Sequence, residues 1–167
     1  MKLTSAEANK LLRKLHDDHE ALKAMEADSR LFVAATTEKL EDARPEYDYE
    51  ATQRSLAELE RQIRTIKHAI NLFNVSQTID ESGMTIDQAL VYIPQLNDRK
   101  RKLAIMRAEQ KKKRNESNRS SNLIEYTYAN YDVTKAEQDY QDTMAELARV
   151  QNALDLVNST VSFEIDS

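Results

Sequence analysis

The chain contains no cysteine among its 167 residues, and it has a single glycine and two prolines. Without thiols it can form neither a disulfide nor a cysteine-ligated zinc site, and thiol catalysis is excluded. Ordinary usage would give roughly 7% glycine and 5% proline, so little of this backbone lies in special turns and long helices are expected. One glycine is also too few for a glycine-rich phosphate-binding loop.

Long apolar runs are absent as well. No window reaches the ~18 apolar residues of a membrane-spanning helix, and the N-terminal segment lacks the apolar stretch of a signal peptide. We therefore expect no transmembrane segment and a cytoplasmic protein. Apolar residues make up 40% of the chain and charged residues 32%, which suits helices that pack side by side and keep broad wet faces. A single domain over residues 1–167 is predicted.

The sequence does contain a repeated three-four spacing of apolar residues, which is typical of helices that pair along a narrow seam. The clearest example comprises Leu56, Leu59, Ile63, Ile66, Ile70 and Phe73. Four such stretches predict helices over residues of about 4–28, 48–74, 85–112 and 132–158. Thr4 with Glu7, and Thr85 with Gln88, fit capping boxes at two helix starts. Pro94 predicts a kink in the third helix, because proline removes a backbone hydrogen bond.

Polar stretches separate these helices and predict loops at about 36–47, 75–84 and 111–122. Two further segments alternate apolar and polar residues, and this period predicts short strands near 123–129 and 160–166. The β-branched and apolar segment 31–34 is another candidate strand. The predicted fold class is therefore mainly α. We expect an elongated antiparallel helical bundle, or coiled-coil-like hairpins, of about four helices with short β-strands.

The two predicted strands flank one helix of about 25 residues, which would span ~37 Å. They cannot pair with each other as a tight hairpin across that length. Each strand therefore needs another partner, either segment 31–34 or a second copy of the chain. Since an unpaired edge strand is a liability, the sequence favours a homo-oligomer.

Four segments together resemble a known family: IKHAINLFN, TIDQALVYIPQLNDRKRKL, LIEYTYANYD and TVSFEID. They are similar to the septicolysin-like family of small, mostly uncharacterised bacterial helical proteins, over nearly the whole chain after Asp48. The resemblance implies a bacterial origin and the order helix, turn, capped helix, strand, helix, strand. It assigns no catalytic residue. The family's toxin label implies membrane activity as one candidate function.

His16, His19 and Glu20 are the candidate metal ligands. On a helix, spacings of three and four residues put them on one face, close enough for one divalent ion. A metalloprotease helix differs, because its glutamate lies between two histidines that are four residues apart. A solvated helix face explains the same residues, and we predict no bound metal.

A row of polar residues, His68, Asn71 and Asn74, lies at three-residue steps beside the apolar seam. Two interpretations stay open. Asparagine suits a helix end, where it tolerates the left-handed conformation. Alternatively, the three side chains line a small polar pocket in the bundle.

The net charge of the chain is -5, yet residues 97–120 contain ten lysines or arginines against three acids. The candidate contacts for a ligand or nucleic acid in and beyond this region are Arg99, Lys111, Lys112, Lys113, Arg114, Tyr126 and Tyr128. Tyrosines beside basic residues can stack bases. A solvated helix end and strand packing explain the same residues, and a pI of 5.3 argues against a general nucleic-acid surface.

The sequence contains no nucleophile elbow, phosphate-binding loop or dinucleotide fingerprint. We therefore predict a protein without enzymatic activity or cofactor: a helical scaffold that self-associates and binds a protein partner. The alternative is a nucleotide- or RNA-binding protein that uses the basic segment 99–119 and the nearby tyrosines, although nucleic acid is not the favoured partner. The third hypothesis is a membrane-active, toxin-like protein.

Overall fold

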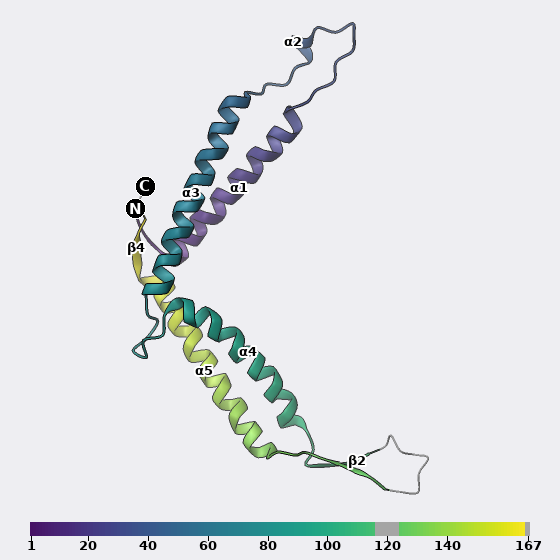
Figure 1. The fold of residues 1–167 in the computed structure, drawn as a ribbon, viewed down its shortest axis with the longest axis vertical. Coiled ribbons are helices and arrows are strands. Elements are labelled where there is room, and N and C mark those ends of the chain that lie inside the picture. The colour runs from purple at the N-terminus through teal and green to yellow at the C-terminus, as the bar shows by residue number, and fades with distance from the viewer. Residues whose placement is uncertain (116–123, 166–167) are drawn as a thin grey trace. The chain divides into compact units, whose positions relative to one another are not determined.

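The computed structural model describes residues 1–115 and 124–165. Five helices and four short strands lie in these two ranges, so the predicted mainly α fold with short strands is confirmed. The chain forms two compact units, residues 1–76 with 158–165, and residues 77–157 (Figure 1). A single folding domain over residues 1–167 stays a prediction. None of the helices in the described ranges has the length and apolar character needed to cross a bilayer.

The first unit is centred on α1 (Ser5–Ser29) and α3 (Tyr49–Ser76), which lie side by side (Figure 1). The predicted seam of α3 is buried at Leu56, Ile66, Ile70 and Phe73 and partly buried at Leu59 and Ile63. From α1, Ala8 and Leu15 complete this core. The seam prediction is confirmed, because the residues at three-four spacing are buried or partly buried.

A small antiparallel sheet covers part of this core. β1 (Lys2–Thr4) pairs with β4 (Ser162–Glu164), and Leu3 lies opposite Phe163. Both of these side chains pack against the buried cluster. The Phe163 ring stacks on Phe73 of α3, with 4.5 Å between the ring centroids. The sheet therefore joins the two ends of the described chain to the apolar end of the helix pair.

The second unit is centred on α4 (Ile86–Ala108) and α5 (Val133–Thr160), which are also neighbours in Figure 1. Its buried residues comprise Ile79, Ile86, Ala89, Leu96, Leu103, Ala136, Thr143, Leu147, Val150, Leu154 and Val157. Arg107 of α4 pairs with Glu137 near the start of α5 at 3.1 Å. The end of α4 thus lies beside the start of α5, as expected of an antiparallel pair.

The three-four repeat of apolar residues in the sequence predicts that Leu90 of α4 and Met144 of α5 face the seam of this unit, and both predictions are wrong. Leu90 is 49% exposed and Met144 is 37% exposed, whereas their neighbours Ala89 and Thr143 are buried. The Thr143 hydroxyl donates a hydrogen bond of 2.7 Å to the carbonyl of Asp139 one turn earlier, so its burial leaves no unpaired donor. The helical period was correct in both helices, but the stripe is rotated by one residue at these points.

Both predicted capping boxes are present. The Glu7 amide donates to Thr4 Oγ1 at 3.3 Å, and the Thr4 amide donates to Glu7 Oε2 at 2.9 Å. Thr85 and Gln88 make the same reciprocal pair at the start of α4. Helix α4 continues through Pro94, so the helix does not break there, and the kink stays a prediction.

The predicted turn between α3 and α4 is confirmed by Gly83, whose φ of 80° lies in the left-handed region that glycine tolerates. The carboxylate of Asp80 in this turn accepts hydrogen bonds from Ser82 and from Arg149 of α5. Arg149 also donates to Glu146 at 2.7 Å. This charged cluster fastens the turn to α5 within the second unit.

The predicted strands have partners within the chain, so the expectation that they need segment 31–34 or a second copy is wrong. β4 pairs with β1, and β3 (Tyr126–Tyr128) pairs with β2 (Lys112–Arg114). Residues 31–34 form no strand and pair with no other strand of the described chain. Because these strands are paired within the chain, they do not favour an oligomer.

Two loop predictions also change. Residues 36–47 include one helical turn, α2 (Leu40–Ala43), which ends before Arg44, where the extended ψ of 123° fits a residue that precedes proline. The predicted loop 111–122 begins with β2. The remaining parts of the segments predicted at 111–122, 123–129 and 160–166, namely 116–123 and 166, lie outside the described residues.

Replacing Ile66 with alanine is expected to lower the free energy of unfolding by about 2–5 kcal/mol, because the side chain is deleted from a packed core. Ile66 is 5% exposed. Denaturant unfolding followed by circular dichroism measures the change. The matched control is Arg64→Ala on the exposed face of the same helix, expected within ~0.5 kcal/mol of the parent. Equal effects of the two substitutions would contradict the packed seam.

The charged turn predicts a loss of stability in acid. Hydrogen bonds from Ser82 and Arg149 lower the pKa of Asp80 below its usual value of 3.8. A carboxyl group with a lowered folded-state pKa stabilises the protein above its unfolded-state pKa, and this contribution is lost as the pH falls through the folded-state pKa. Asp80→Asn should therefore lower the melting temperature at neutral pH and have a smaller effect well below pH 3.8. Thermal melts across this range would contradict the assignment if the effect of Asp80→Asn were independent of pH.

Candidate ligand-binding surfaces

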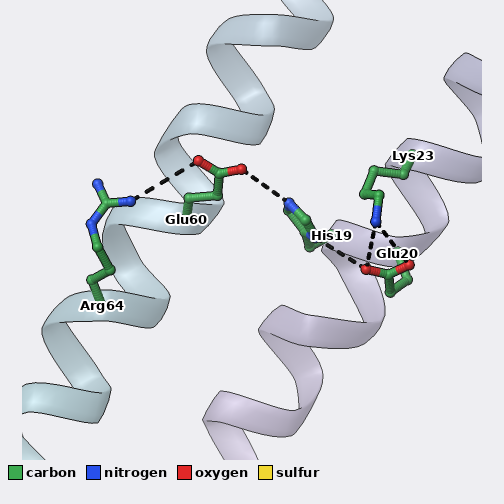
Figure 2. Close-up of polar contacts among 5 residues, drawn as sticks. All are labelled: His19, Glu20, Lys23, Glu60 and Arg64. Atoms are coloured by element: carbon green, nitrogen blue, oxygen red, sulfur yellow. Dashed lines mark hydrogen bonds and ion pairs between the residues drawn. The ribbon is translucent and has the colours of Figure 1, made fainter.

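His19, one of the candidate metal ligands, lies at the seam between α1 and α3. Its Nε2 is 3.4 Å from Glu60 Oε1 on α3, and its Nδ1 is 3.4 Å from Glu20 Oε1. Lys23 pairs with Glu20 at 3.1 Å and Arg64 with Glu60 at 4.0 Å, so a cation flanks each carboxylate (Figure 2). The His19 side chain is 16% exposed. The cluster therefore links the two helices through alternating basic and acidic side chains.

This arrangement brings together only two of the three predicted metal ligands, His19 and Glu20. His16 is exposed and takes no part in the cluster. The hydrogen bond from Lys23 lowers the pKa of Glu20, which keeps that carboxylate paired with an ammonium group. Within residues 1–115 and 124–165, no group of three histidine, aspartate or glutamate side chains is placed to hold a metal ion.

Glu26 occupies a second polar position between the same helices, nearer the loop that follows α1. Its Oε1 accepts hydrogen bonds from the Tyr47 hydroxyl at 2.7 Å and from Gln53 Nε2 at 2.6 Å. The bond to the Glu26 carboxylate raises the pKa of Tyr47 to about 12. These contacts fasten the end of the loop to both helices. The sequence analysis missed this cluster, because its members are far apart in the chain and follow no motif.

Of the three residues in the polar row on α3, only one lines a cavity. His68 lines a shallow groove of about 400 Å³ in the first unit, together with Leu72, Phe73 and Phe163. Of the other two predicted pocket residues, Asn71 is exposed and Asn74 is half-buried, and neither lines this groove. The structure thus brings His68 to an aromatic groove and leaves the two asparagines beside it on the helix.

Arg99 lies apart from the other basic candidates, in a groove of about 490 Å³ between α4 and α5 that Lys102 also lines. The α5 side of this groove carries acids: Asp139, Asp142 and Glu146. Farther along α4, Arg107 pairs with Glu137, whose pKa is lowered mainly by a hydrogen bond from Gln141 and also by Arg107. Acidic residues of α5 therefore line the same groove as Arg99 and Lys102, and this part of segment 99–119 is not a continuous cationic surface.

The basic run after α4 forms one edge of a two-stranded ribbon. Strands β2 and β3 pair so that Lys112 lies opposite Tyr128 and Arg114 lies opposite Tyr126. Residues two apart on a strand share a face, and directly opposed residues share it too. The ribbon therefore presents two cations and two aromatic rings on one face, while Lys113 lies on the other.

Contacts on this ribbon face join Lys112 to both rings. Lys112 Nζ lies 4.0 Å from the centroid of the Tyr126 ring and 5.5 Å from that of Tyr128. The two ring centroids are 6.4 Å apart, with an angle of 53° between the ring planes. Tyr126 is 44% exposed and Tyr128 is 61% exposed. Aromatic surface and positive charge are thus available at the same place.

The other basic candidates differ in position. Lys111 lies just before β2, and its charge contributes to the lowered pKa of Asp132, which comes mainly from the backbone amide of Thr134. Arg119 lies outside the described residues. The sequence analysis placed the basic run near the tyrosines but missed strand β2. The spacing of two short segments around a polar loop was the signal for a hairpin, and only the pairing reveals the shared face.

Comparison with known proteins supports the fold. No family model and no curated protein matches this chain. It is similar to a functionally unknown conserved protein from Corynebacterium diphtheriae, seen in a crystal structure, with a TM-score of 0.59 and 16% identity. The match covers 98% of this chain and 100% of that one. At this identity the similarity extends to the fold, and membership of the septicolysin-like family stays a prediction.

Replacing His19 with leucine is expected to raise the free energy of unfolding by about 1 kcal/mol, because added apolar burial at the seam outweighs exposed ion pairs. Differential scanning calorimetry measures the shift. His16→Leu, three residues earlier on the exposed face, is the matched control and should stay within ~0.5 kcal/mol of the parent. A lower melting temperature for His19→Leu would mean that the contact with Glu60 contributes more than the burial.

Proposed function

We propose that this protein is a non-enzymatic helical scaffold that self-associates, with residues 31–35 as its contact to a second copy. The observation that carries the proposal is the apolar run LFVAA between α1 and α2, in which four of the five residues are exposed. Leu31 is 78% exposed and Val33 is 96% exposed. Single exposed apolar residues are ordinary, but a consecutive exposed run is uncommon unless it serves an interaction.

Exposure alternates along this run. Phe32 is 38% exposed, and the guanidinium carbon of Arg44 lies 5.8 Å from its ring centroid. The residues on either side of Phe32 project much more apolar surface into solvent. A period of two is that of an extended segment with one covered face and one open face. The segment thus has the pattern of a strand and lacks only a partner strand.

The backbone of the segment is open to pairing. Residues 31–34 belong to no helix or strand, and within the described parts of the chain their amides and carbonyls join no backbone ladder. Their C-terminal flank is held, because the Ala35 amide donates to Glu38 Oε2 at 2.8 Å. An extended apolar segment can add to another backbone strand, and two identical segments satisfy each other around a two-fold axis.

The expected dimer is weak. Fully burying a leucine or valine side chain contributes about 1.5–3 kcal/mol, and a symmetric contact buries Leu31 and Val33 twice. Association costs an estimated 4–15 kcal/mol in lost motion, so little free energy remains. The dimer should therefore form with a dissociation constant in the micromolar range or above, and its population should depend on concentration.

Sedimentation equilibrium between about 1 µM and 1 mM tests this proposal. The mass should rise from 19.2 kDa toward twice that value as the concentration increases. Val33→Lys should hold the protein at the monomer mass, because two lysines would face each other across the two-fold axis. The matched control is Val91→Lys on α4, where the parent valine is 58% exposed and the dimer should persist. A parent that stays monomeric throughout, or a Val33→Lys variant that still dimerises, would overturn the proposal.

A further inference from the structure

We propose that the face of the β2–β3 ribbon formed by Lys112, Arg114, Tyr126 and Tyr128 is a binding site for single-stranded nucleic acid. These four residues, called the ribbon face below, lie in the second unit. The inference does not rest on self-association through residues 31–35. It concerns a different surface and is tested by a different measurement.

The first support is the arrangement of the ribbon face. The pairing of β2 with β3 sets a cation opposite each ring, so the cations lie along one strand and the rings along the other. Single-stranded nucleic acid has the same two components, a row of phosphates and a row of bases beside it. Lysine and arginine bind phosphates, and aromatic side chains stack on bases of any sequence.

The second support is that the rings remain accessible. Lys112 lies over the Tyr126 ring, which is still 44% exposed. An exposed cation–π contact changes an equilibrium constant by roughly two- to five-fold, whereas stacking of one base changes it by roughly five- to 150-fold. A base can therefore displace the ammonium group from a ring with a net gain. The displaced Lys112 then lies beside the backbone phosphate of the same nucleotide.

A groove extends this face toward the helices. Tyr128 lines it together with Ile105, Met106 and Tyr131, and its volume is about 410 Å³. The Tyr131 hydroxyl donates a hydrogen bond of 2.7 Å to the carbonyl of Met106, which fixes one wall. Ile105 is 67% exposed. A base stacked on Tyr128 lies at the mouth of this groove and gains apolar contact there.

The distribution of charge on the protein favours binding of a single strand over binding of a duplex or an anionic membrane. The protein carries a net charge of -5, so long-range attraction to phosphates is weak. Duplex backbones and anionic membranes are bound mainly through charge, and the ribbon face offers only two cations. Stacking must supply most of the affinity, and unpaired bases are the groups that can stack. The two exposed tyrosines therefore favour a single strand.

Fluorescence anisotropy with a labelled single-stranded RNA of about twelve nucleotides tests the site on the chain of residues 1–167. We expect binding whose logarithmic salt slope is about -1.4, because each of two neutralised phosphates contributes ~0.7. Changing Tyr126 and Tyr128 together to leucine should weaken binding by roughly 100-fold, about ten-fold for each stacked base. Changing Lys112 and Arg114 together to glutamine should flatten the slope toward zero.

Matched control variants distinguish a loss of binding from a loss of folding. Tyr49→Leu removes a tyrosine that is 64% exposed in the first unit, and Lys10→Gln with Lys14→Gln removes two exposed charges from α1. These variants should bind as the parent does. The ribbon variants should keep the parent's circular dichroism and melting temperature, because all four side chains are exposed.

The proposal is overturned if the parent does not bind the oligonucleotide, or if the ribbon variants bind as well as the controls. It is also overturned if phosphatidylserine vesicles bind the protein in a ribbon-dependent manner while the oligonucleotide does not, since the site would then serve an anionic membrane. The mass of the protein, measured separately, reports on self-association. Each proposal can therefore fail without the other.

Discussion

The apolar seam between α1 and α3 is the contact around which the first unit is arranged. Its strongest part lies where Ile66 and Ile70 meet α1 and where Phe163 stacks on Phe73. Toward the other end, His19 and Glu26 bring polar side chains between the helices. Polar contacts at partly exposed positions contribute less than buried apolar surface. The helix pair is therefore held mainly from the end that carries the sheet, and the opposite loop is joined by weaker contacts.

Charge is distributed differently in the second unit. Arg99 and Lys102 line a groove with three acids of α5, and Arg149 is shared between Asp80 and Glu146. Basic and acidic side chains of this unit thus lie close to one another. The ribbon face differs, because Lys112 has aromatic rings rather than carboxylates as its described contacts. A basic sequence segment is thus divided by the fold into a balanced part and a part that is open to a ligand.

Sequence alone predicted what depends on local spacing. The three-four repeat located the helices, and the capping boxes at Thr4 and Thr85 located two of their starts. The repeat could not decide whether Ala89 or Leu90 is buried, because both lie near the same stripe and only the partner helix selects between them. Hydropathy alone predicts that the larger apolar side chains, such as Leu90, are the buried ones. Packing of α4 against α5 placed alanine and threonine there.

Short strands depend on partners, and for that reason sequence could not identify them all. Segment 31–34 has strand-like residues but pairs with no strand of the described chain, whereas Lys112–Arg114 is a polar run that becomes a strand because it lies beside Tyr126–Tyr128. The candidate site follows the same rule. Basic and aromatic residues were visible in the sequence, but their common face is fixed by the register of the ribbon. A shift of that register by one residue would put the cations and the rings on opposite faces, so the register is what makes this surface a candidate binding site.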